Sequence, residues 1–70
     1  MKYNNDVINS IKKHMAKNGL SQIEMAKKLE IAQVNLNRIL TGKVSKARGV
    51  TAKKIIEVLG SDLDLDKLEY

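Results

Sequence analysis

The sequence contains no cysteine, proline, phenylalanine or tryptophan, and its only aromatic residues are Tyr3 and Tyr70. Without cysteine the chain forms no disulfide and no thiolate metal site, a composition that fits a reducing compartment. The core must therefore be aliphatic. No apolar run approaches the roughly 20 residues of a membrane-spanning helix. The polar stretch 1–6 is not followed by the apolar region of a signal peptide. We therefore expect a cytoplasmic protein with no membrane segment.

The charge of the chain is distributed unevenly. Residues 1–60 carry twelve Lys and Arg against four acidic residues, a balance of +8, whereas residues 61–70 carry a balance of −3. A basic body suits a polyanion such as DNA, although a lysine-rich surface is also common in proteins without such a partner. We expect the acidic C-terminal end to face away from DNA phosphates. Seventy residues allow one domain.

Apolar residues recur at helical spacing along the chain, and no stretch shows the alternation of a strand. Asn5 or Asp6 can cap a first helix, which is predicted to run from there to about Asn18. Gly19 is placed to end it, because glycine accepts the left-handed conformation common after a helix. Residues 43–50 are predicted as a loop.

Two further helices are predicted in the C-terminal third. Thr51 can cap a fourth helix, and Gly60 can close it. A short fifth helix is expected to begin near Asp62 or Asp64, within the segment 61–70. The predicted fold is all-α: a compact bundle of about five short helices that forms a single domain over the whole chain.

The most informative stretch, residues 21–42, predicts a helix-turn-helix. Ser21 can cap a helix, and Glu24 three residues later completes a capping-box pattern. Ile31 lies in the short connection as an apolar plug. A second periodic helix then follows over residues 33–41.

The outward face of that second helix is polar. At roughly 100° per residue, five positions fall within an arc of about 140°, opposite the apolar ones. These positions are Gln33, Val34, Asn37, Arg38 and Thr41. Amides suit adenine, a guanidinium suits guanine, and methyl groups suit the thymine methyl. An ordinary amphipathic helix with a solvated face would look the same. Combined with the capping box, short turn and basic charge, the face favours DNA binding.

Residues 19–43, GLSQIEMAKKLEIAQVNLNRILTGK, resemble the lambda repressor-like helix-turn-helix family of phage repressors, Cro proteins and small bacterial regulators. The resemblance implies that Gln22 opens the second helix and touches a phosphate, while Gln33 hydrogen-bonds to it and reads adenine. Val34 and Arg38 match the next base-reading positions, and Asn37 shares their face. The positions that match the family's phosphate-gripping region are Ser21, Gln22, Lys43, Lys46 and Arg48.

The sequence departs from the family pattern in three places. Glu30 stands where the family usually has a glycine in the turn, and a non-glycine residue in a left-handed conformation costs on the order of 1 kcal/mol. Ala32 replaces the usual Ser or Thr cap of the recognition helix. Met15 and Leu40 stand where members often carry an Arg–Glu ion pair. Because both positions are apolar here, we expect the two side chains to pack on each other.

No catalytic, metal-binding or cofactor-binding pattern is present, so we expect no enzyme. His14 is the only histidine, and we expect it to be a solvated side chain on the first helix. Asp62, Asp64 and Asp66 alternate, but they lack the glycine and glutamate spacing of a calcium loop. We interpret them as helix caps and solubilising charge.

These observations lead to one main hypothesis and two alternatives. The main hypothesis is a bacterial or phage-encoded transcriptional regulator of the phage or mobile-element repressor type, bound to double-stranded DNA. It would bind a palindromic operator as a homodimer through segment 61–70. The residues considered for that contact are Leu63, Leu65, Leu68 and Tyr70. The first alternative is an antitoxin-like or other protein-interaction module of the same fold. The second, an RNA-binding module, lacks aromatic stacking platforms.

Overall fold

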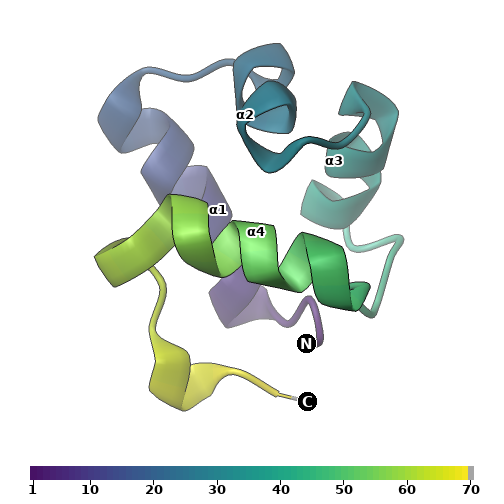
Figure 1. The fold of residues 1–70 in the computed structure, drawn as a ribbon, viewed down its shortest axis with the longest axis vertical. Coiled ribbons are helices and arrows are strands. Elements are labelled where there is room, and N and C mark those ends of the chain that lie inside the picture. The colour runs from purple at the N-terminus through teal and green to yellow at the C-terminus, as the bar shows by residue number, and fades with distance from the viewer. Residues whose placement is uncertain (70) are drawn as a thin grey trace.

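The fold of residues 1–69 is described here from a computed structural model of the chain (Figure 1). It has four α-helices followed by two short 3-10 turns. These elements are α1 (Asn5–Asn18), α2 (Gln22–Leu29), α3 (Gln33–Leu40), α4 (Gly49–Leu59), η1 (Gly60–Asp62) and η2 (Leu65–Lys67). Within residues 1–69 the only strand-like feature is an isolated antiparallel bridge between Lys2 and Lys46. The all-α prediction is confirmed, and two 3-10 turns replace the expected fifth helix.

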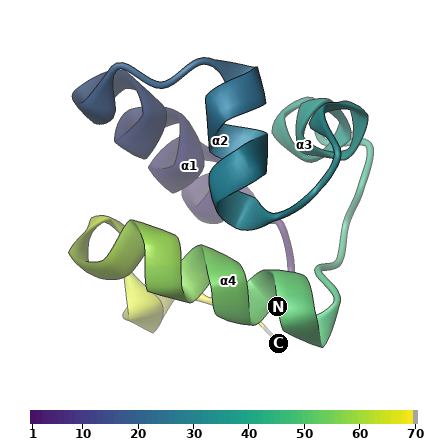
Figure 2. The same cartoon turned by 45° about the horizontal axis from the view of Figure 1, so that its top comes forward.

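An aliphatic core holds the four helices together, as the composition predicted. Each helix contributes at least one fully buried side chain. The largest of them are Val7 and Ile11 of α1, Met25 and Leu29 of α2, Leu36 of α3 and Ile55 of α4. Figure 2 shows α2 lying between α1 and α3, with α4 crossing beneath them. Since α2 packs against both α3 and α4, the inner side of α3 is fixed while its outer side faces solvent.

The first helix begins one residue earlier than the sequence predicted. Its cap is Asn4, whose Oδ1 accepts a hydrogen bond from the Val7 N–H at 2.9 Å. The same side chain donates to the Lys67 carbonyl oxygen at 3.1 Å. The prediction of Asn5 or Asp6 was wrong because this long-range contact already holds Asn4 in an extended conformation. The expected end is confirmed, since Gly19 is left-handed with φ 62°.

The start of the fourth helix also differs from the prediction. Arg48 occupies the cap position and α4 begins at Gly49, so Thr51 lies inside the helix and does not cap it. The Ala47 N–H donates to the Met1 carbonyl oxygen at 2.7 Å. This contact with the N-terminal segment fixes the chain just before Arg48, and the helix follows directly. The predicted loop over 43–50 is therefore two residues too long.

His14 is buried and paired, so the expectation of a solvated side chain was wrong. It is 8% exposed, and its Nδ1 lies 2.8 Å from Asp62 Oδ2. The Lys17 Nζ lies 3.0 Å from the other oxygen of the same carboxylate. The pairing arises because η1 folds back onto α1, which brings together residues far apart in the sequence.

The C-terminal segment covers the core of its own chain. Leu63 is buried and Leu68 packs against the core, whereas Leu65 is 59% exposed. Of the leucines considered for a dimer contact, only Leu65 remains on the surface. Tyr70, the fourth residue of that set, lies outside the described residues.

Candidate nucleic-acid interface

The capping box at the start of α2 is confirmed. The Ser21 Oγ accepts a hydrogen bond from the Glu24 N–H, and the Glu24 carboxylate accepts one from the Ser21 N–H, both at 3.2 Å. These bonds lower the pKa of Glu24, which keeps the carboxylate ionised at the positive end of the helix. The first helix of the motif thus has a defined start.

A non-glycine residue takes a left-handed conformation in the turn between α2 and α3. Glu30 takes the left-handed conformation, with φ 57° and ψ 40°, and is the single non-glycine residue within 1–69 that has a positive φ. Its carboxylate lies 2.8 Å from Lys54 Nζ on α4. Ile31 follows and packs against the core as the predicted plug. The short turn therefore holds α3 at a fixed angle despite the missing glycine.

The two ends of α3 are built differently. Ala32 is the N-cap residue and provides no side-chain hydrogen bond, so the first amides of the helix are open to water or an anion. At the other end Gly42 has φ 77°. The Lys43 N–H donates to the Arg38 carbonyl oxygen at 2.9 Å, which closes the helix as expected for a glycine end.

The outward face of α3 carries the predicted base-reading residues together. Gln33, Val34, Asn37 and Arg38 are all exposed, and Val34 is 58% exposed. On the opposite side of the helix Leu36 and Ile39 are buried and Leu40 is half-buried. Thr41, the fifth residue of the predicted arc, bonds through its hydroxyl to the Asn37 carbonyl oxygen at 2.9 Å. One exposed helix face therefore displays two amides, a guanidinium and a pair of methyl groups.

The predicted phosphate-contacting residues come from two segments. Ser21 and Gln22 lie at the start of α2, where Ser21 is exposed and Gln22 half-buried. Lys43, Lys46 and Arg48 lie on the connection between α3 and α4, and all three are exposed. Both segments thus present polar or cationic groups to solvent.

The N-terminal segment, residues 1–3, supports the basic connection, a contact that sequence reasoning missed. The Tyr3 N–H donates to the Ser45 carbonyl oxygen at 3.0 Å, in addition to the bond from Ala47 to Met1. The Tyr3 side chain is 7% exposed and belongs to the core. No local pattern signals this pairing, because it joins residues more than 40 positions apart.

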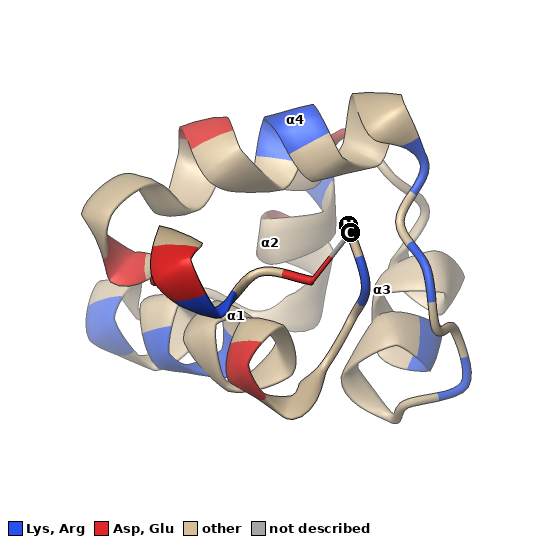
Figure 3. Cartoon of the chain, turned by 90° about the horizontal axis from the view of Figure 1, so that it is seen from below, with Lys and Arg blue, Asp and Glu red and all other residues tan. Residues whose placement is uncertain are grey.

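The segment that contains α3 and the connection after it carries basic charge. Residues 31–56 include six Lys and Arg and no Asp or Glu. Among residues 1–69 none of the ion pairs involves Arg38, Lys43, Lys46 or Arg48. In Figure 3 basic positions without acidic ones among them lie on α3 and along the connection after it, while further basic positions lie on α1 and α4. Figure 1 shows the acidic C-terminal segment below α4, with α2 and α3 above it. Uncompensated cationic groups on one side suit a polyanion.

Two further observations concern metal ligands and membrane spans within residues 1–69. No group of three or more His, Asp or Glu side chains there could hold a metal ion. None of the helices in this range is long and apolar enough to cross a membrane.

Comparison with known proteins agrees with this geometry. A family model described as helix-turn-helix matches residues 11–65. The match covers most of the chain and runs from the middle of α1 to the start of η2. No curated protein and no solved structure matches the chain.

Proposed function

The chain belongs to the Cro/C1-type helix-turn-helix family of DNA-binding regulators, and on that premise we propose that it is a sequence-specific transcriptional repressor. It is of the phage or mobile-element type and acts on double-stranded DNA in the bacterial cytoplasm. The observation that carries this proposal is the exposed polar face of α3, which stands on a rigid two-helix support beside unpaired cationic groups.

In this proposal α3 lies in the major groove. The exposed amides of Gln33 and Asn37 hydrogen-bond to adenine, and the guanidinium of Arg38 donates to guanine O6 and N7. The methyl groups of Val34 contact a thymine methyl. Arg38 is suited to this role because it has no ion-pair partner among residues 1–69, so binding a base breaks no salt bridge.

The phosphate contacts flank this helix. Ser21 and Gln22 approach one stretch of backbone, and Lys43, Lys46 and Arg48 approach another. Such contacts fix the position of α3 in the groove and supply most of the salt-dependent affinity, but they carry little sequence information.

We also propose that the protein binds a palindromic site as a two-fold dimer. The two turns of α3 reach only a few base pairs, which is too little to define one site in a genome. Two-fold symmetry places a second recognition helix one turn of DNA away. Segment 61–70 is the proposed contact, and Leu65 is its most exposed leucine.

Selection of binding sites from random duplexes, followed by sedimentation of the protein on the selected site, tests both parts. We expect an enriched palindrome and a complex with two chains per duplex. An enriched single half-site bound by one chain would overturn the proposed dimer but not the proposed sequence-specific regulator. The absence of any enriched sequence would overturn the regulator and favour the antitoxin-like alternative.

A further inference from the structure

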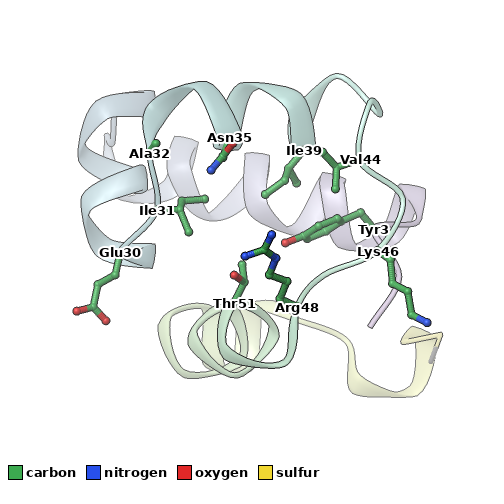
Figure 4. Close-up of a pocket in the computed structure, with 10 residues that line it drawn as sticks. All are labelled: Tyr3, Glu30, Ile31, Ala32, Asn35, Ile39, Val44, Lys46, Arg48 and Thr51. Carbon is green, nitrogen blue, oxygen red and sulfur yellow. The ribbon is translucent and has the colours of Figure 1, made fainter.

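A pocket of about 450 Å³ opens between α3 and the start of α4, and Tyr3 forms part of its wall. Figure 4 shows the Tyr3 hydroxyl and the Arg48 guanidinium pointing toward each other in this space. Within residues 1–69 neither side chain forms a hydrogen bond with the protein, and neither leaves a buried polar atom without a partner, so both groups are open to the solvent of the pocket. Two facing donors without an acceptor between them match a site for an anion.

Of these two side chains, Tyr3 gives the stronger indication of an anion site. The residue is only 7% exposed, and its hydroxyl is directed into the pocket (Figure 4). Because residues 1–69 contain no buried side-chain oxygen or nitrogen that lacks a hydrogen-bond partner, this hydroxyl is open to the solvent in the pocket and can meet a ligand there. Burial also raises the pKa of Tyr3, so the hydroxyl stays protonated and donates. A bound oxyanion would complete its hydrogen bonding.

The start of α4 contributes the second group of donors. This helix has eleven residues, and its cap residue, Arg48, makes no side-chain cap hydrogen bond. The amides of Gly49, Val50 and Thr51 therefore remain without a side-chain acceptor at the positive end of the helix dipole. Thr51 itself lines the pocket. Amides at a helix start, joined by a guanidinium, are a common arrangement for binding phosphate.

The remaining lining does not oppose a negative charge. Asn35 directs its amide toward the pocket, and Ile31 and Ile39 form an apolar wall (Figure 4). The acidic residue of the lining is Glu30, whose carboxylate turns away from the pocket in Figure 4 and pairs with Lys54 at 2.8 Å. The Lys46 side chain also extends away from the pocket. Its positive charge still adds to the local potential.

We propose that this pocket binds one phosphate group, held by the Tyr3 hydroxyl, the Arg48 guanidinium and the first amides of α4. In the DNA complex that group is a backbone phosphate, a statement that rests on the proposed function. Tyr3, which sequence analysis did not consider, is then a DNA-contacting residue as well as a core residue. The other possible source of the same chemistry is a small phosphorylated molecule.

The first arm of the test uses inorganic phosphate and no DNA. Backbone amide NMR shifts of Gly49, Val50 and Thr51 are followed as phosphate replaces chloride at constant ionic strength. We expect saturable shifts in the unmodified protein and binding weaker by about tenfold or more in Tyr3→Phe, which removes one hydrogen bond to a charged group. The phenylalanine keeps the buried ring, so the fold persists. Lys53→Gln, also on α4, is the matched control and should bind phosphate nearly unchanged.

The second arm uses duplexes in which single phosphates are replaced by neutral methylphosphonates. At one position the replacement should weaken DNA binding by the unmodified protein by about three- to tenfold. It should weaken DNA binding by Tyr3→Phe much less, because the hydroxyl and that phosphate are coupled. A hydroxyl that only supported the loop would show no such coupling at any position. Tyr3→Phe should leave the log–log salt slope unchanged, since it removes no charge.

The results of the two arms distinguish the phosphate site, its occupant and the proposed function. Saturable phosphate binding, together with one methylphosphonate position whose effect is coupled to Tyr3, confirms the site and shows that a DNA backbone phosphate occupies it. Phosphate binding without a coupled position keeps the site and rejects the backbone as its source. The absence of both overturns the proposal even if the protein selects a DNA sequence. Failure to select any sequence overturns the proposed function while the first arm still decides the phosphate site.

Discussion

The His14 imidazole and the Asp62 carboxylate meet at 2.8 Å across 48 positions of sequence. Lys17 bonds to the second carboxylate oxygen at 3.0 Å. The hydrogen bond from His14, followed by that from Lys17, lowers the pKa of Asp62 below its ordinary 3.8. This cluster fastens η1, and with it the start of the C-terminal segment, to the end of α1.

The lowered pKa of Asp62 predicts a contribution to acid stability. The carboxylate stabilises the folded state at pH values above 3.8, and this contribution is lost as the pH falls through the lower folded-state pKa. Between about pH 5 and pH 2 the unfolding free energy of the unmodified protein should therefore fall more steeply than that of Asp62→Asn. Urea denaturation at a series of pH values measures both slopes. Equal slopes would mean that the pair does not persist in solution.

Backbone strain at Glu30 predicts a stabilising substitution. Because glycine accepts a positive φ without strain, Glu30→Gly should raise the melting temperature by roughly 4 °C. Loss of the exposed ion pair with Lys54 should offset little of that gain. Glu30→Ala is the matched control, since it removes the charge but keeps the strained backbone. If the melting temperature rises equally in both variants, or in neither, backbone strain at residue 30 does not limit the stability of the protein.

Met15 and Leu40 are predicted to pack on each other. Both are half-buried and pack against the core, and α1 contacts α3. A double-mutant cycle with Met15→Ala and Leu40→Ala should give a coupling energy of about 0.5 kcal/mol or more. Strict additivity of the two unfolding free energies would show that the side chains do not meet.

The cationic connection between α3 and α4 predicts a sequence-independent effect. Lys46→Ala and Arg48→Ala should each weaken binding to all duplexes about equally and reduce the log–log salt slope by roughly one. Lys53→Ala removes the same kind of charge from α4 and serves as the reference. If the slope for Lys46→Ala matches that reference, its ammonium group does not contact the DNA backbone.

Features set by neighbouring residues were predictable from the sequence. The capping box of Ser21 and Glu24 and the helix ends at Gly19 and Gly42 depend on contacts within a few positions, and all of them are present. The exposed face of α3 followed from helical periodicity alone.

Features set by distant contacts were not predictable in this way. Arg48 replaces Thr51 at the start of α4 because the N-terminal segment holds Ala47. His14 is buried because η1 returns to α1. The pocket between α3 and α4 likewise depends on Tyr3, whose pairing with Ser45 leaves no trace in local sequence. Each case requires knowing which segments meet after folding.

The most direct test of the account is to repeat the site selection with Arg38→Ala. The guanidinium is exposed on α3, and a bidentate contact to one guanine is worth about 1–3 kcal/mol of discrimination. We expect a selected site that matches that of the unmodified protein except at one base pair per half-site, where the preference for guanine is lost. An unchanged site, with guanine still preferred at every position, would contradict the claim that α3 reads the DNA sequence.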